Sequence, residues 1–284
     1  GISAVGIITG RYLMASGGSD ANKQNVKIGY MLSENLSTGM YNVIIGRRAG
    51  EAVNTGNNVV LIGANAGYSL TDQTGGVFIG NNAGNNATKA NNVYIGSEVA
   101  KFSTSAEQNV IIGTYAGIDN QGNENTLLGY YSGRGSSGVT DGTRNTFIGS
   151  QSGFKIQGGD DNTGVGRNSL RELLGGNKNI AIGQQAGDAL VSGNNNIIIG
   201  YQADASTSTT SNEITLGDAN IKHLRVPGIG VSFNNTGGTQ LGIITATELD
   251  ISGDIDVDGH TNLDNVSIAG VTTFSSDLNV AENI

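Results

Sequence analysis

Three aspartates near the carboxyl-terminal end of the sequence have the spacing of a metal site. Asp254, Asp256 and Asp258 stand two residues apart and Gly259 follows them, as at the start of a calcium-binding loop. Position twelve of such a loop normally supplies a bidentate glutamate, but here it is Asn265. The residues between the aspartates are apolar, which is typical of a strand with one solvated face. We interpret the segment as a strand and keep calcium as the weaker alternative.

Residues that could serve in catalysis are few and scattered. His223 and His260 lie in separate segments, and neither has a serine and an aspartate at a spacing that identifies a triad. Asp160 and Asp161 could act as paired carboxylates, but adjacent turn residues usually diverge, whereas glycosidases hold their two carboxyl groups about 5 to 9.5 Å apart. We predict no catalytic residue, no cofactor and no enzymatic activity, with a β-helical polysaccharide depolymerase as one alternative.

The element that must position every side chain is a short block that recurs along most of the sequence. Each block ends in a glycine, and successive glycines are 16, 17 or, once, 20 residues apart. The repeat glycines are Gly29, Gly46, Gly63, Gly80, Gly96, Gly113, Gly129, Gly149, Gly166, Gly183, Gly200 and Gly217. A fixed period of this length indicates a repeat architecture. We predict an all-β fold, a parallel β-roll or β-solenoid with one rung per repeat.

The residues one and three positions before each glycine are aliphatic or β-branched in every block. In a strand, residues two apart point to the same side, so stacked rungs would align them in two apolar columns. We expect these columns to form the interior of the roll. The predicted core consists of Val43, Ile45, Val60, Ile62, Val77, Ile79, Val93, Ile95, Val110, Ile112, Ile180, Ile182, Ile197 and Ile199.

The residue between these two columns points the opposite way and is also apolar in most blocks. A strand that is apolar on both faces is buried on both faces. Because a rung of this length encloses one thin interior, we expect the second face to pack against other copies of the chain in an intertwined homotrimer. The residues assigned to inter-chain packing are Ile44, Leu61, Phe78, Tyr94, Ile111, Leu127, Phe147 and Ile198.

Polar and small residues complete the block. Asparagine stands four positions before the glycine in most blocks, where its amide can bond the local backbone and stack between rungs. Alanine or serine usually stands three positions after the glycine, followed in many blocks by a second glycine that turns the chain.

Composition excludes several classes of protein. The formal net charge is −9, which opposes nucleic-acid binding because such binding depends on a cationic surface. The sequence has no cysteine, and no apolar run is long enough for a membrane span. It opens with Gly1 rather than methionine, and we expect a fragment or a processed product.

The rung Asn-Val-x-Ile-Gly-x-x-Ala/Ser, seen for example from Asn42 to Ala49, resembles the head repeats of trimeric autotransporter adhesins. It also resembles glycine-rich repeats of phage tail fibres. The resemblance covers residues 25–220 and implies a trimeric β-roll, although the adhesin repeats are somewhat shorter. Residues 246–284 alternate apolar and polar residues and resemble fibre segments of marine cyanophages.

These patterns divide the sequence into four parts. We expect a lead-in or capping segment at 1–24, a twelve-rung roll at 25–220, a transition at 221–245 and a short β fibre shaft at 246–284. The leading functional hypothesis is a structural segment of a virion tail fibre, acting as a spacer or host-attachment rod. The alternative location is the bacterial cell surface, as the head of a trimeric adhesin.

Two segments interrupt the regular pattern and could carry recognition. Residues 134–142 extend the longest repeat, and residues 167–174 have a helical pattern. Tyrosines beside the repeat glycines could stack on sugars, although packing is the favoured interpretation; they are Tyr30, Tyr115, Tyr130, Tyr131 and Tyr201. The expected partners are copies of the same chain, other virion proteins and a host glycan or protein, without nucleic acid or membrane insertion.

Overall fold

A computed structural model describes residues 13–15, 24–32, 36–89, 91–135 and 141–221. The chain divides into two compact units, Gly1–Leu224 and Arg225–Ile284, and all described residues belong to the first. Residues 222–245 of the expected transition, the expected β shaft, both histidines and the calcium candidate Asp254, Asp256 and Asp258 lie outside the described residues.

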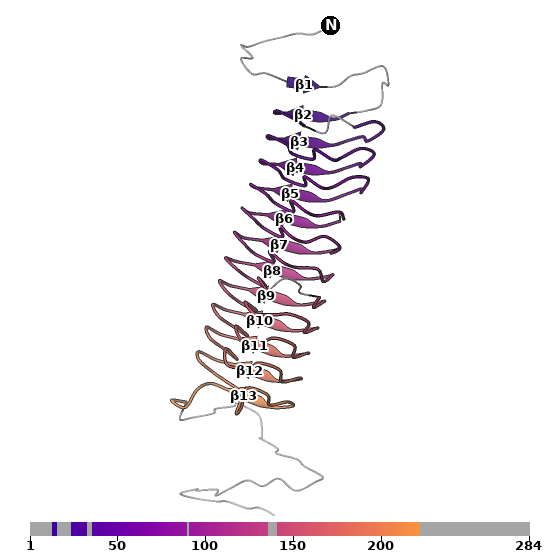
Figure 1. Cartoon of the computed structure of the whole chain (residues 1–284). Coiled ribbons are helices and arrows are strands. Elements are labelled where there is room, and N and C mark those ends of the chain that lie inside the picture. The colour runs from indigo at the N-terminus through magenta and orange to yellow at the C-terminus, as the bar shows by residue number, and fades with distance from the viewer. Residues whose placement is uncertain (1–12, 16–23, 33–35, 90, 136–140, 222–284) are drawn as a thin grey trace, which may run out of the picture. The chain divides into compact units, whose positions relative to one another are not determined.

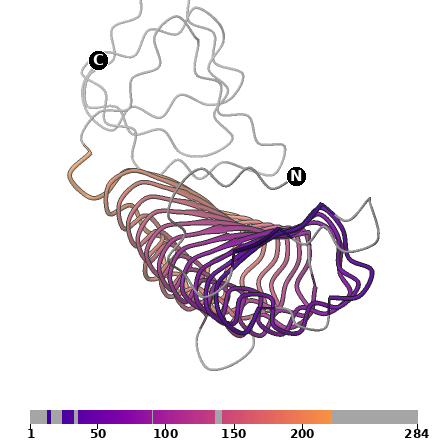
Figure 2. The same cartoon turned by 90° about the horizontal axis from the view of Figure 1, so that it is seen from above.

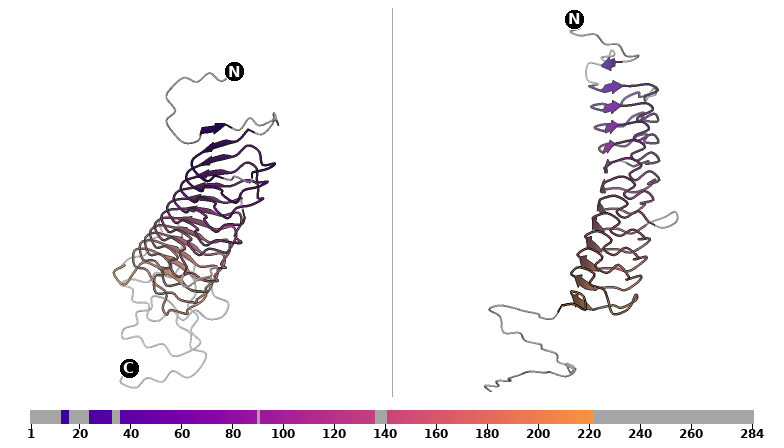
Figure 3. Two further views of the ribbon diagram at one scale, coloured as in Figure 1. Left: turned by 45° about the horizontal axis from the view of Figure 1, so that its top comes forward. Right: turned by 90° about the vertical axis from the view of Figure 1, so that its left-hand side faces the viewer.

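The described residues form a parallel β-solenoid in which each repeat contributes one three-residue strand (Figures 1 and 3). The strands are β1 (Leu13–Ala15), β2 (Val26–Ile28), β3 (Val43–Ile45), β4 (Val60–Ile62), β5 (Val77–Ile79), β6 (Val93–Ile95), β7 (Val110–Ile112), β8 (Thr126–Leu128), β9 (Thr146–Ile148), β10 (Thr163–Val165), β11 (Ile180–Ile182), β12 (Ile197–Ile199) and β13 (Ile214–Leu216). They form a single sheet in sequence order. The predicted all-β solenoid with rungs of about 17 residues is confirmed.

Every pair of neighbours from β2 to β13 is parallel and in register, whereas β1 pairs with β2 antiparallel. The longest repeat keeps this register, since Thr126 pairs with Thr146 across its 20-residue gap. The extra residues therefore leave the sheet unchanged. Viewed from above, the rungs lie behind one another as a fan of similar loops (Figure 2).

The repeat glycine ends each strand in a conformation that other residues rarely adopt. At Gly113 the backbone φ angle is 139°, and a Cβ atom there would lie 2.3 Å from the carbonyl oxygen of Gly129 on the next rung. The Gly113 amide meanwhile donates to the carbonyl oxygen of Ile95 at 2.8 Å. Backbone conformation and rung spacing both require glycine here.

The interior contains the second residue of each strand from β3 to β12, not the first and third. Ile44, Leu61, Phe78, Tyr94 and Ile111 are completely buried within the single chain. Leu127, Phe147 and Ile198, which were also assigned to inter-chain packing, are buried beside them. The predicted contact of this column with other chains is therefore wrong, because these side chains fill the solenoid itself.

The residues predicted as core point outward, which is the reverse of the expectation. They are half-buried or exposed, and none is in the buried core: Val43, Ile45, Val60, Ile62, Val77, Ile79, Val93, Ile95, Val110, Ile112, Ile180, Ile182, Ile197 and Ile199. The physical reason lies in the asparagine four positions before the glycine. It shares a strand face with the second strand residue, and its buried amide bonds fix that face inside.

A second core column lies seven residues after the repeat glycine and was missed by the sequence interpretation. Its apolar members are Val53, Leu70, Ala87, Ile156, Leu173 and Leu190. Volumes compensate across the interior. Gly164 occupies the second position of β10, and in that rung Leu170 replaces the usual second glycine and is fully buried.

The segment 167–174 contains no helix, contrary to its sequence pattern. Leu170 and Leu173 are both buried, and Leu170 has a φ angle of 49°. The spacing of three between them arises from two successive inward-pointing positions of a rung. The apolar spacing that suggested a helix therefore belongs to a turn of the solenoid.

Tyr94 gives the interior a measurable response to alkaline pH. Its ring stacks on Phe78 at 4.8 Å between centroids, and its hydroxyl lies 3.2 Å from Ser103 Oγ. Burial raises the pKa of the Tyr94 hydroxyl well above the ordinary value of about 10. The stabilisation that this neutral hydroxyl contributes is present below pH 10 and is lost as pH rises, because only the unfolded state releases the proton readily.

We expect Tyr94→Phe to weaken the fall in the free energy of unfolding above pH 10, by up to about 1.4 kcal/mol per pH unit. Denaturant titrations at pH 9 and pH 11 measure this difference. Tyr201→Phe is the control, since Tyr201 is 58% exposed. Equal alkaline slopes for wild type and Tyr94→Phe would contradict the burial of an un-ionised hydroxyl.

Candidate functional site

The most extensive candidate site is the outward side of the sheet, which we call the outer face. It consists of the first and third residues of strands β2 to β13. The first positions are Val26, Val43, Val60, Val77, Val93, Val110, Thr126, Thr146, Thr163, Ile180, Ile197 and Ile214. The third positions are Ile28, Ile45, Ile62, Ile79, Ile95, Ile112, Leu128, Ile148, Val165, Ile182, Ile199 and Leu216.

The outer face is uncharged, mostly apolar and partly open to solvent in the single chain. Exposed fractions reach 38% at Val110, 42% at Ile182 and 68% at Ile214. With strands about 4.8 Å apart, the face extends for roughly 50 Å. Soluble proteins rarely expose a continuous apolar strip of this length unless it contacts a partner.

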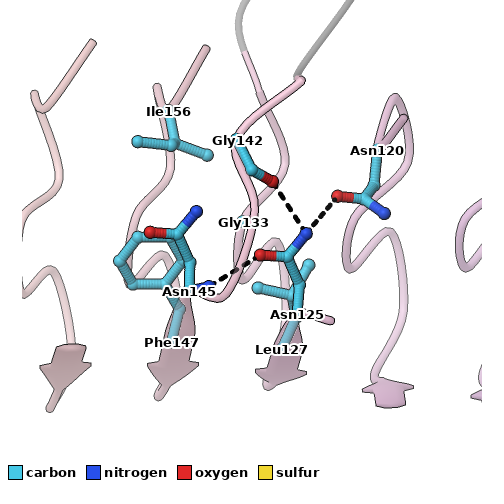
Figure 4. Close-up of a pocket in the computed structure, with 8 residues that line it drawn as sticks. All are labelled: Asn120, Asn125, Leu127, Gly133, Gly142, Asn145, Phe147 and Ile156. Atoms are coloured by element: carbon cyan, nitrogen blue, oxygen red, sulfur yellow. Dashed lines mark hydrogen bonds between the residues drawn. The ribbon is translucent and has the colours of Figure 1, made fainter. Parts of the chain in front are cut away.

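Behind the sheet, buried asparagines connect successive rungs. Figure 4 shows Asn125, whose Nδ2 donates to Asn120 Oδ1 at 3.1 Å and to the Gly142 carbonyl oxygen at 2.8 Å. Its Oδ1 accepts from the Asn145 backbone amide at 2.8 Å. One side chain thus satisfies groups on neighbouring turns, which holds the strands in register.

Asp160 and Asp161 belong to a turn beside the sheet and not to a paired carboxylate site. Asp160 Oδ1 accepts from the backbone amide of Thr143 at 2.7 Å and from its hydroxyl at 3.0 Å. Asp161 forms an ion pair with Arg144 at 2.7 Å, and this bond lowers the pKa of the Asp161 carboxyl. Both carboxylates therefore link neighbouring rungs.

Four aromatic rings gather on one flank of rungs β7 to β9. Tyr115 and Tyr131 stack with centroids 5.0 Å apart, and Tyr130 meets Tyr131 edge-on at 4.3 Å. The guanidinium group of Arg134 lies 5.5 Å from the Tyr131 ring and 5.3 Å from that of Phe154. These rings mainly contact one another and arginine. The cluster lies at the base of the 134–142 insertion, of which residues 136–140 are outside the described part.

Tyr30 and Tyr201, the other two tyrosines considered for sugar stacking, stand apart from this cluster. They are 55% and 58% exposed. The structure thus brings together three of the five tyrosines that the sequence singled out, Tyr115, Tyr130 and Tyr131.

Within the described ranges, no group of three or more histidine, cysteine, aspartate or glutamate side chains is arranged to hold a metal ion. No helix in that part of the chain is long and apolar enough to cross a membrane.

Comparison with protein-family models, curated proteins and solved structures finds no match. The class of protein therefore follows from the geometry alone. The chain contains a parallel β-solenoid repeat domain with a polar ladder inside and an apolar face outside.

The variation of the second strand position is a further signal in the sequence for the orientation of the strands, beside the asparagine column. The second strand position varies from Gly164 and Ala181 to Phe147 and Tyr94, and Gly164 is accompanied by the larger buried Leu170 later in its own rung. Compensation of this kind is typical of a packed interior. The outer columns vary little, and most of their residues are β-branched, as is typical of strands.

Proposed function

We propose that this chain is a structural rod segment that assembles as a homotrimer through its outer face. The observation that carries the proposal is the pair of uncharged, mostly apolar columns that continues from β2 to β13. Covering such columns removes apolar surface from water along the whole rod. In the proposed trimer, the interface is formed by the first and third strand residues and not by the second.

Self-association fits this surface better than a globular partner does. The face repeats with the spacing of β-strands, and a partner can match it along its length only if it has the same period. A second copy of the chain has that period by construction. The absence of charged side chains on the face removes repulsion between copies.

We further propose that the rod serves in a virion tail fibre as a spacer or host-attachment element. Support comes from the resemblance of its repeats to tail-fibre and trimeric-adhesin repeats, and from the rod-like solenoid. Other virion proteins and a host surface glycan or protein are the proposed partners at its ends or flanks.

Light scattering coupled to size exclusion tests the assembly. The chain has a mass of 29.0 kDa, so a trimer gives 3 × 29.0 = 87 kDa. We expect 87 kDa for wild type and 29.0 kDa for Ile95→Lys/Ile112→Lys. The double lysine variant places charges in the centre of the proposed interface, where burial without a partner is costly.

Ser97→Lys/Thr114→Lys is the matched control, because both residues are exposed in the same two rungs but lie off the outer face. We expect it to remain trimeric. A wild-type mass of one chain would refute self-assembly, and a trimeric Ile95→Lys/Ile112→Lys variant would place the interface elsewhere. Unchanged circular dichroism verifies that each variant is folded.

A further inference from the structure

The outer face carries one short polar interruption. Its first column consists of valines from β2 to β7, threonines in β8, β9 and β10, and isoleucines from β11 to β13. The interruption consists of Thr126, Thr146 and Thr163, which we call the threonine block. Their side chains are half-buried and lie in three successive rungs.

The three hydroxyl groups have no hydrogen-bond partner among the described residues, although their backbone amides do bond the next rung. In the single chain they face water. If the outer face is covered, each hydroxyl must find another polar group or remain buried without one, which is unfavourable. The neighbouring positions of the column, Val110 and Ile180, cannot supply a partner.

We propose that the threonine block sets the orientation and register of the assembled chains as parallel and in register. This inference rests on the proposed self-assembly through the outer face. In that arrangement Thr126, Thr146 and Thr163 each meet their own counterparts. Around a three-fold axis, three hydroxyl groups at one level can each donate to the next and accept from the previous one.

The block lies off the centre of the sheet, and this placement distinguishes orientations. If two chains paired antiparallel over the full length from β2 to β13, β8 would meet β7, β9 would meet β6 and β10 would meet β5. Every threonine would then face valine: Val110, Val93 or Val77. An antiparallel pairing that matches the threonines would leave β2, β3 and β4 without a partner.

A parallel arrangement displaced by one rung is also disfavoured. It would place Thr126 against Val110 of one neighbour, or Thr163 against Ile180. In purely aliphatic columns, a shift by one rung would cost little free energy, because valine and isoleucine pack about equally well against each other and against themselves. A few buried polar groups can specify register in this way, as asparagine does in coiled coils.

The absence of native cysteine makes the register directly measurable. Val60→Cys in β4 and Ile180→Cys in β11 occupy positions that would face each other in the full-length antiparallel pairing. The two full-length single-cysteine chains are co-folded, oxidised and analysed by mass spectrometry for 60–60, 180–180 and 60–180 disulfides. We expect the first two and not the third.

The role of the threonines is tested in the same cysteine backgrounds by Thr126→Val/Thr146→Val/Thr163→Val. We expect the assembly to persist, with loss of the exclusive 60–60 and 180–180 pattern and appearance of 60–180 adducts. The control is Thr71→Val/Thr74→Val/Thr114→Val, which makes the same chemical change at exposed positions away from the outer face.

The outcomes separate the two proposals. A chain that stays monomeric by light scattering refutes self-assembly. An assembly with predominant 60–180 disulfides refutes the parallel register while leaving self-assembly intact. An unchanged disulfide pattern in the triple valine variant refutes the threonine block as the device that sets the register.

Discussion

Gly113→Ala is expected to be among the most damaging single substitutions in the solenoid. The new Cβ atom would lie 2.3 Å from the carbonyl oxygen of Gly129, and the residue would have to keep a φ angle of 139°. The rungs of Gly113 and Gly129 cannot move apart freely, because both are hydrogen-bonded to further rungs. We expect a loss of about 3 to 5 kcal/mol in the free energy of unfolding.

Gly175→Ala provides the matched control for this prediction. No atom lies within 4 Å of the position where its Cβ would be built, and its φ angle is not in the left-handed region. We expect its stability to differ little from wild type. Thermal and denaturant unfolding followed by circular dichroism measures both variants. Similar stability of Gly113→Ala and Gly175→Ala would mean that the rungs are not as closely spaced as described.

Because Gly113 lies near the middle of the array, its replacement should also change the unfolding transition. Each rung contacts mainly its neighbours, so stability is close to a sum of rung and interface contributions. Weakening one central interface should allow the two halves to unfold separately. We expect a broader transition, or two transitions, in place of one.

Asn162→Ala is expected to have the second-largest effect. Asn162 Oδ1 accepts from the backbone amide of Asn179 at 3.0 Å, and its Nδ2 donates to the carbonyl oxygen of Gly176 at 2.8 Å. All these groups are buried, and alanine would leave the amide and the carbonyl oxygen without their partner. We expect a loss of about 2 to 6 kcal/mol, taking about 1 to 3 kcal/mol for each unsatisfied group.

Asn194→Ala is a control with nearly the same bonds in a different environment. Asn194 Oδ1 accepts from the backbone amide of Asn177 at 2.9 Å and from its Nδ2 at 3.0 Å, but at the solvent-exposed surface. Water can replace these bonds, so we expect a loss below about 1 kcal/mol. Denaturant unfolding compares the two variants. Equal losses would show that the burial of Asn162 does not increase the contribution of its hydrogen bonds to the free energy of unfolding.

The sequence predicted the all-β solenoid and its rung length of about 17 residues correctly. The expected roll at 25–220 contains every strand from β2 to β13, because the glycine column marks the end of each strand. The prediction of which side of the strand faces inward was wrong. All three residues of a strand such as Val43–Ile45 are apolar, so hydrophobicity alone gives no preference.

The asparagine column carried the missing information. Asn42 and Ile44 lie two residues apart and share a face, and Asn42 is fully buried. A side chain that bonds backbone groups on successive turns must lie inside the solenoid, so Ile44 does too. The partner groups, such as the carbonyl oxygen of Gly56, lie 14 residues away, and such distant pairings are not visible in a local pattern.

The in-register pairing across the 20-residue repeat shows that extra residues in a turn do not change the pairing of the strands. The same independence applies to the number of rungs, since each turn of the chain is supported by the one before it. Duplication or deletion of one repeat in the gene would lengthen or shorten the rod by about 4.8 Å without redesign of the remainder. The solenoid thus resembles a ruler, in which distance from an attachment point is encoded by a count of repeats.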